Sequence, residues 1–146
     1  MEHQTRERLQ RIADVHTNMR RALTRGERLA RWVELLERTP DRYLNTLSET
    51  EYRPAAIRDG MRSDNSPLTV AFEDSVLRAD GLGGDTYGET KRFFELSDLD
   101  MHQLVCSCHS GATVRAAVVA ECVREVAAPG PGLFAMLLNA MMIFRV

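Results

Sequence analysis

Histidines and cysteines with the chemistry of metal ligands lie close together in one segment, at His102, Cys106, Cys108 and His109. Imidazole nitrogens and thiolate sulfurs bind zinc and other first-row transition metals at roughly 2.0 to 2.3 Å. On a helix that turns by about 100° per residue, His102, Cys106 and His109 fall within about 60° of one another. The spacing therefore predicts a stripe of three candidate metal ligands, His102, Cys106 and His109, at the border of a solvent-exposed face.

The length of this stripe limits how it could bind a metal ion. Residues 102 and 109 are about 10 Å apart along a helix axis, and helical side chains lean toward the N-terminus. We therefore expect at most two of the three residues to bind one transition-metal ion, with the other ligands supplied from elsewhere, for example by His16 or Cys122. Cys108 falls on the adjoining apolar face, so we expect a buried side chain there.

The same segment suggests a second chemistry, in which Cys106 is a reactive thiol. Imidazolium at His109, three positions later, could lower the pKa of the Cys106 thiol and increase its thiolate fraction. Redox sensing would need only that Cys106 be accessible and lie near Cys108 or Cys122. No catalytic residues are assigned, because the sequence identifies neither an orienting carboxylate nor an oxyanion site. A metal- or redox-responsive regulator is therefore one functional hypothesis.

The hydrophobic periodicity predicts that helices position this segment. We expect an all-α fold, a compact bundle of about five to seven helices. Residues 1–38 are predicted as an amphipathic helical arm, residues 41–66 as irregular, and residues 67–128 as a helical body. Residues 129–132 are a Pro/Gly break before an apolar tail, residues 133–146. N-cap signals at Thr24, Ser66, Thr86 and Ser97 predict helix starts, and the helix that begins after Ser97 is expected to reach residue 108.

Composition and charge narrow the functional classes. The 146 residues include 19 basic and 21 acidic side chains, so no excess of positive charge favours nucleic acid or a membrane as a partner. Residues 1–42 contain ten arginines and seven acids, whereas residues 43–128 contain eight bases and fourteen acids. These opposite local charges could attract one another within one chain or between chains. Three cysteines and an N-terminus without a signal sequence predict a cytoplasmic location.

Residues 86–108 resemble the helix-turn-helix motif of bacterial DNA-binding proteins. The resemblance rests on a Thr-capped first helix, a Leu-Ser turn at residues 96–97 and an apolar rhythm in the second helix. It implies that the second helix would read the major groove of DNA. Lys91 stands where a small buried residue is usual, Glu95 where glycine is usual, and Asp98 and Asp100 would face phosphate. DNA binding is therefore the third functional hypothesis. It ranks after protein association, described next, and after the metal- or redox-responsive regulator.

The first functional hypothesis is protein association without catalysis, most simply as a homodimer. Twelve of the fourteen residues from 133 to 146 are apolar, and as a helix they would span about 21 Å, too short for a membrane. Such a segment must be buried in this domain or in a partner. The candidate interface residues lie on the first helical seam and on this tail: Leu9, Ile12, Met19, Leu23, Leu133, Phe134, Leu137, Met141 and Phe144.

Overall fold

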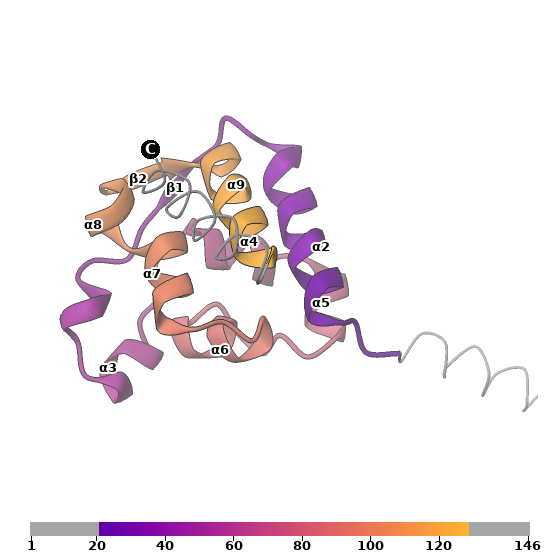
Figure 1. The fold of residues 1–146 in the computed structure, drawn as a ribbon, viewed down its shortest axis with the longest axis horizontal. Coiled ribbons are helices and arrows are strands. Elements are labelled where there is room, and N and C mark those ends of the chain that lie inside the picture. The colour runs from indigo at the N-terminus through magenta and orange to yellow at the C-terminus, as the bar shows by residue number, and fades with distance from the viewer. Residues whose placement is uncertain (1–20, 129–146) are drawn as a thin grey trace, which may run out of the picture.

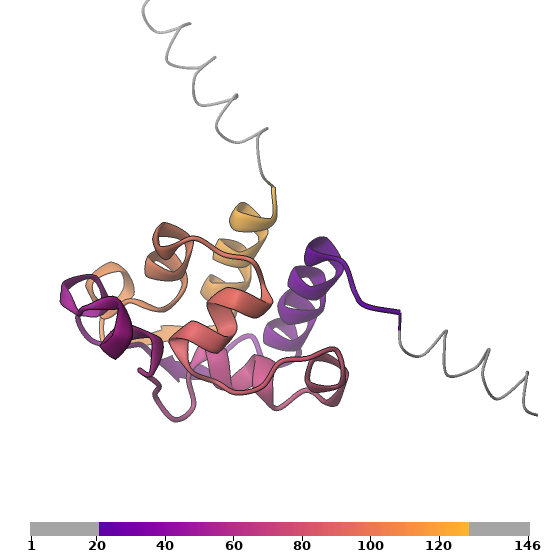
Figure 2. The same cartoon turned by 90° about the horizontal axis from the view of Figure 1, so that it is seen from below.

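Two helices, α2 (Arg25–Arg38) and α9 (Ala116–Ala127), pack along each other (Figure 1). The computed structural model describes residues 21–128 of the chain. Shorter helices complete the fold: α3 (Ala55–Asp59), α4 (Pro67–Phe72), α5 (Ser75–Ala79), α6 (Tyr87–Phe93), α7 (Asp98–Val105), α8 (Ser107–Ser110) and the 3-10 turn η1 (Thr50–Tyr52). In both views α3 lies at the end of the molecule remote from α2 (Figure 2).

Side-chain caps begin four of these helices at the residues that the sequence predicted. Thr24 forms a reciprocal capping box with Glu27 at the start of α2, and Ser66 and Ser97 form the same arrangement before α4 and α7. Thr86 accepts a hydrogen bond from the backbone of Glu89 before α6. Each cap satisfies backbone N–H groups that have no partner within the helix, and a cap of this kind stabilises a helix by about 1 kcal/mol.

The hydrophobic core is centred on Trp32 of α2, which is fully buried. Its indole stacks on the Phe94 ring, with ring centroids 4.5 Å apart, and its Nε1 donates a 3.0 Å hydrogen bond to the backbone oxygen of Pro67. Leu29 and Leu36 of the same helix are also fully buried. Residues 25–38, predicted as the second half of a helical arm, therefore form a central element of the fold.

A small antiparallel sheet corrects the purely helical prediction. The described residues are mostly helical, as expected, but β1 (Tyr43–Asn45) pairs with β2 (Thr113–Arg115), and Leu44 lies opposite Val114. Both of these central residues are buried, whereas the flanking positions are more exposed. A strand of three residues is too short for an alternating pattern to be recognised in the sequence. Residues 113–115 lie within the predicted helical body, residues 67–128, but the last helix begins only at Ala116.

The helical segment that begins after Ser66 consists of two short helices. Asp74 separates α4 from α5, and its Oδ2 accepts a 3.2 Å hydrogen bond from the backbone N–H of Leu77 as the N-cap of α5. The same carboxylate binds the Arg31 guanidinium through two hydrogen bonds, of 3.1 and 2.9 Å. Asp74 therefore ties the start of α5 to α2.

Most of the predicted interface residues lie outside the described residues: Leu9, Ile12, Met19, Leu133, Phe134, Leu137, Met141 and Phe144. Leu23 is described, and it packs against the hydrophobic core as a partly buried side chain. None of the helices within residues 21–128 has both the length and the apolar character required to span a membrane.

Replacing Asp74 tests the link between α2 and α5. The hydrogen bond from Arg31 holds the pKa of the Asp74 carboxyl below its usual range, so the ionised form is favoured by folding. Asp74→Asn keeps a capping oxygen but removes the charge, and we expect it to lower the free energy of unfolding at pH 7 by about 1 kcal/mol. Urea denaturation measures this difference.

The pH dependence of the Asp74→Asn effect has a defined sign. The stability gained from a carboxylate with a depressed pKa is complete above its unfolded pKa, about 3.9, and is lost as the pH falls through the folded pKa. The difference between wild type and Asp74→Asn should therefore be smaller at pH 3.5 than at pH 7. Glu34→Gln is the control, because this exposed carboxylate also contacts Arg31, at 3.6 Å, and should have little effect. An equal loss in both variants would contradict the assignment.

Candidate metal centre

The corner between α7 and α8 is created by a backbone contact with Leu47. The N–H of Leu47 donates a 2.7 Å hydrogen bond to the Val105 oxygen, and the Leu47 oxygen accepts a 2.8 Å hydrogen bond from the N–H of Ser107. Cys106 between them adopts an extended conformation, with φ −77° and ψ 134°. The predicted helix over residues 97–108 is therefore wrong beyond Val105, because a second chain segment takes over the pairing of its backbone.

The same segment brings Glu51 to this corner. After Leu47, the chain turns at Glu49, whose φ of 55° lies in the left-handed region, and enters η1. Thr46 also holds the segment, since its backbone N–H donates to the Ala112 oxygen over 3.1 Å. Glu51 is thereby placed in contact with Cys106, although 55 residues separate them in the chain.

Four side chains converge at this corner, and one donor atom from each lies within 4.8 Å of all the others: Glu51, His102, Cys106 and Cys108. The Sγ of Cys106 donates a 2.9 Å hydrogen bond to Oε2 of Glu51 and lies 2.7 Å from the Sγ of Cys108. Nδ1 of His102 lies 3.7 Å from the same Glu51 oxygen and 3.8 Å from the Cys108 sulfur. We refer to these four residues as the Glu-His-Cys₂ cluster.

The dimensions of the Glu-His-Cys₂ cluster fit a tetrahedral ion after a small expansion. Metal–ligand bonds of zinc place neighbouring ligand atoms about 3.3 to 3.8 Å apart in a tetrahedron. The two distances from His102 Nδ1 already have this length. The two contacts of Cys106 Sγ, at 2.9 and 2.7 Å, are shorter, and an ion would lengthen each of them by up to about 1 Å. Formation of a site would therefore require movement of the Cys106 side chain.

Burial in the cluster is graded from the interior to the surface. Cys106 is almost completely buried, with an exposed fraction of 1%, and His102 is half-buried. Cys108 and Glu51 are exposed. The Glu51 side chain is less accessible than the residue as a whole, with an exposed fraction of 26%. An ion held here would therefore lie near the surface, with Cys106 as its innermost ligand.

The cluster contains acidic groups so close together that ionisation of one opposes ionisation of another. The hydrogen bond from Cys106 lowers the pKa of the Glu51 carboxyl, which favours its ionised form. The hydrogen bond with Cys106, then burial and the nearby Glu51, raise the pKa of the Cys108 thiol to about 12. Without a cation, the cluster thus keeps a carboxylate and a protonated Cys108 at neutral pH. A divalent cation would remove this conflict, because it stabilises thiolate and carboxylate together.

The sequence identified two members of the cluster and missed two. His102 and Cys106 are present as predicted, but His109, the third predicted ligand, is not part of the group, and its ring centroid is 6.5 Å from that of His102. The expected burial of the cysteines is reversed: Cys108 is exposed and Cys106 is buried. The cause is the break at Cys106, which turns residues 107–110 away from the direction of α7.

The two residues considered as additional ligands do not join the cluster. Cys122 lies in α9 as a partly buried side chain packed against the core, and burial raises the pKa of its thiol. His16 lies outside the described residues. Glu51, the ligand that sequence reasoning missed, stands in a segment without periodicity and carries no motif that distinguishes it from other exposed acids.

The segment that resembles a helix-turn-helix forms two helices, α6 and α7, that contact each other. Lys91 of α6 reaches the start of α7, where its Nζ lies 2.9 Å from Oδ1 of Asp98. Asp98 also accepts a 2.9 Å hydrogen bond from the Tyr87 hydroxyl. Glu95 in the turn has φ 53°, the left-handed conformation for which glycine is usual. DNA binding by this segment stays a prediction.

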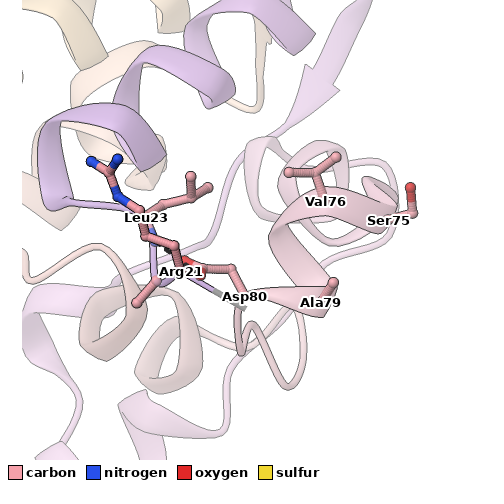
Figure 3. A pocket seen from close by; sticks show the side chains of 7 residues that line it. Arg21, Leu23, Ser75, Val76, Ala79 and Asp80 are labelled. Atoms are coloured by element: carbon pink, nitrogen blue, oxygen red, sulfur yellow. Dashed lines mark hydrogen bonds between the residues drawn. The ribbon is translucent and has the colours of Figure 1, made fainter. Parts of the chain in front are cut away.

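A surface pocket of about 510 Å³ lies between residues 21–23 and α5 (Figure 3). Its acidic residue, Asp80, is engaged in the fold: it accepts hydrogen bonds from the Leu23 backbone, at 3.0 Å, and from Arg28, at 2.7 Å. The Asp80 carboxylate therefore has a structural role, whereas the Glu-His-Cys₂ cluster presents donor atoms suited to a ligand.

The Glu-His-Cys₂ cluster could hold a transition-metal ion. Comparison with protein-family models, with curated proteins and with solved structures found no match for this chain. The site is therefore characterised by its donor atoms: two sulfurs, one imidazole nitrogen and one carboxylate oxygen.

Glu51→Gln tests the electrostatics of the metal-free cluster. Removing the carboxylate takes away one of the groups that raise the pKa of the Cys108 thiol, so we expect that pKa to fall from about 12 toward the ordinary value of about 8.5. The contact with Cys106 remains, so the fall should be partial. The pH dependence of Cys108 alkylation, followed by peptide mass spectrometry in the presence of a chelator, measures the change.

Glu49→Gln is the matched control for this measurement. Glu49 lies two residues from Glu51 but contacts Arg53, at 3.6 Å. Its replacement should leave the alkylation profile of Cys108 unchanged, with Cys122 as an internal reference in each sample. An identical profile for wild type and Glu51→Gln would refute the proposed contact between Glu51 and the thiols.

Proposed function

We propose that this protein is a metal-responsive regulator that reversibly binds one zinc ion through Glu51, His102, Cys106 and Cys108. The convergence of four different donor side chains, with ligand atoms within 4.8 Å of one another, is the observation that carries the proposal. Three of the donors, His102, Cys106 and Cys108, come from α7, α8 and the corner between them, and Glu51 comes from η1. An ion would join η1 to the corner between α7 and α8.

The donor set favours zinc over other common metal ions. Calcium and magnesium prefer six or more oxygen ligands, whereas this cluster has one carboxylate, two sulfurs and one imidazole. Zinc accepts all three ligand types and prefers four-coordinate tetrahedral sites. Thiolate and imidazole together also suit copper and iron, so the relative affinities for these ions form part of the test.

The exposure of the ligands favours reversible binding over a permanent structural role. Cys108 and Glu51 belong to exposed residues, which allows an ion to enter and leave without unfolding of the core. Four protein ligands fill a tetrahedral coordination shell, and catalytic zinc sites instead keep a position for water or substrate. A role in sensing or regulation is therefore favoured over zinc-dependent catalysis.

Self-association through the first helical seam and the apolar tail stays a separate prediction, because all but one of the residues named for it lie outside residues 21–128. It is compatible with zinc binding, since a regulator could change its oligomeric state with its metal content. Native mass spectrometry of the full chain would report the bound ion and the oligomeric state in one measurement.

The ligand assignment predicts one zinc ion per chain and a specific pattern of variants. Purified reduced protein, freed of metal with a chelator, should bind one equivalent of zinc in a competition titration. Cys108→Ser, His102→Ala and Glu51→Gln should each weaken binding by at least about tenfold, since each removes a ligand. Cobalt substituted for zinc should give the absorption spectrum of a tetrahedral thiolate site.

Two variants control for unspecific effects of histidine and cysteine loss. His109→Ala removes the neighbouring histidine that is not part of the cluster, and Cys122→Ser removes the cysteine of α9. Both should bind zinc as wild type does. If zinc does not bind, or if His109→Ala weakens binding as much as His102→Ala, the assignment is wrong.

Zinc should also change the local stability of the segment that carries Glu51. A ligand present at 100 times its Kd stabilises the binding-competent state by about 2.7 kcal/mol. We expect the backbone amides of residues 47–53 and 105–111 to exchange more slowly with solvent deuterons when zinc is bound. Amides in the centre of α2 serve as the reference, and equal protection throughout the chain would contradict a local effect of the ion.

A further inference from the structure

We propose that Cys106 and Cys108 form a reversible disulfide that excludes zinc, so that oxidation of the Glu-His-Cys₂ cluster releases the ion. This inference rests on the proposed function, because the same two sulfurs serve as zinc ligands. It makes the site responsive to a thiol oxidant as well as to zinc. The oxidant is a low-molecular-weight disulfide such as oxidised glutathione.

The two thiols are already in contact. Their sulfur atoms are 2.7 Å apart in the reduced cluster, and both cysteines are free. With one residue between them, their Cα atoms cannot be more than about 7 Å apart, and disulfides join Cα atoms that are about 4.4 to 6.8 Å apart. Because α8 begins at Ser107, the chain bends between the two cysteines instead of extending. A bond between the sulfurs therefore requires only local adjustment.

Disulfide formation and zinc binding are mutually exclusive in this geometry. Zinc binds thiolates, and a disulfide removes the negative charge from both sulfurs. Only His102 and Glu51 would remain as ligands, and half of the tetrahedral shell would be lost. The ring closed by neighbouring cysteines is small, and strain in such a ring makes the bond easier to reduce. The disulfide is therefore suited to switching and less to permanent stabilisation.

The difference in exposure assigns an order to the two thiols. Cys108 is exposed, whereas Cys106 has an exposed fraction of 1% and contacts Glu51 on its other side. A disulfide from solution can therefore reach Cys108 first. Cys106 is then positioned to attack the sulfur of Cys108, which it already contacts.

The reaction proceeds by two successive thiol–disulfide exchanges. Zinc, when bound, holds Cys108 as the thiolate, because a coordinated thiol loses its proton. This thiolate attacks one sulfur of oxidised glutathione, forms a mixed disulfide and releases one glutathione thiolate. The Cys106 thiolate then attacks the Cys108 sulfur and releases the second glutathione thiolate. The two protein sulfurs lose two electrons, oxidised glutathione gains them, two protons from solvent convert the released thiolates to thiols, and Zn²⁺ leaves as the free ion.

The test measures oxidation of the full chain in glutathione buffers, with and without a defined concentration of free zinc. Samples are equilibrated without oxygen, free thiols are alkylated, and mass spectrometry reports the fraction with a bond between Cys106 and Cys108. If zinc binds only the reduced form, zinc at 100 times its Kd should raise the midpoint ratio [GSSG]/[GSH]² about 100-fold. A chromogenic chelator should detect one zinc ion released for each disulfide formed.

His102→Ala separates the disulfide from the metal. This variant retains both cysteines but loses a ligand, so the effect of zinc is measured as the shift from the variant's own midpoint without zinc. With at least about tenfold weaker binding, the same free zinc should shift its midpoint by no more than about tenfold. Cys122→Ser controls for the third thiol, and it should behave as wild type in both conditions.

The outcomes distinguish this inference from the proposed function. Reduced protein that binds one zinc ion, but whose Cys106 and Cys108 stay reduced while Cys122 acquires glutathione, would overturn the inference and leave the zinc site intact. A disulfide whose midpoint is insensitive to bound zinc would also overturn it. Failure of the reduced chain to bind zinc, seen before any oxidant is added, would refute the proposed function and the competition together.

Discussion

The pairing of Leu47 with the backbone around Cys106 is the constraint on which the site depends. Buried N–H and C=O groups must find partners, and the end of α7 finds two of them in the Leu47 backbone. This contact halts the helix at Val105, allows Cys106 an extended conformation and starts α8 in a new direction. It also fixes the strand-like segment that leads to Glu51. One pair of hydrogen bonds therefore determines both halves of the cluster.

Cys106 lies between the other acidic groups of the cluster. Its sulfur contacts the Glu51 carboxylate on one side and the Cys108 sulfur on the other, so one side chain joins the groups that a cation would otherwise hold together. The arrangement has three compatible states on chemical grounds: protonated and hydrogen-bonded, coordinated to a cation, or oxidised to a disulfide. The sulfurs of Cys106 and Cys108 carry protons in the first state, bind the cation in the second and bond to each other in the third. Only small movements of the two side chains separate these states.

The helices and the candidate site differed in how far the sequence could predict them. Caps such as Thr24 and Ser97 act over three or four residues, so local sequence is sufficient to predict where those helices begin. The end of α7 is set by Leu47, more than fifty residues earlier, so the local sequence does not predict where this helix ends. Glu51 was missed for the same reason. His102 and Cys106 were found because their chemistry is rare, whereas His109 was included only on the assumption of a continuous helix.

The long separation between Glu51 and Cys106 has a consequence for protein synthesis. At about 5 to 20 residues per second, the ribosome adds Cys106 roughly 3 to 11 seconds after Glu51. The emerging chain therefore presents the carboxylate long before the imidazole and the thiols exist. Because β2 and α9 follow the cysteines and complete the core, a nascent chain can hold the full donor set in place only after residues 107–127 have also been synthesised. Capture of a metal ion through all four donors would therefore wait for these later elements, although the carboxylate of Glu51 is made first.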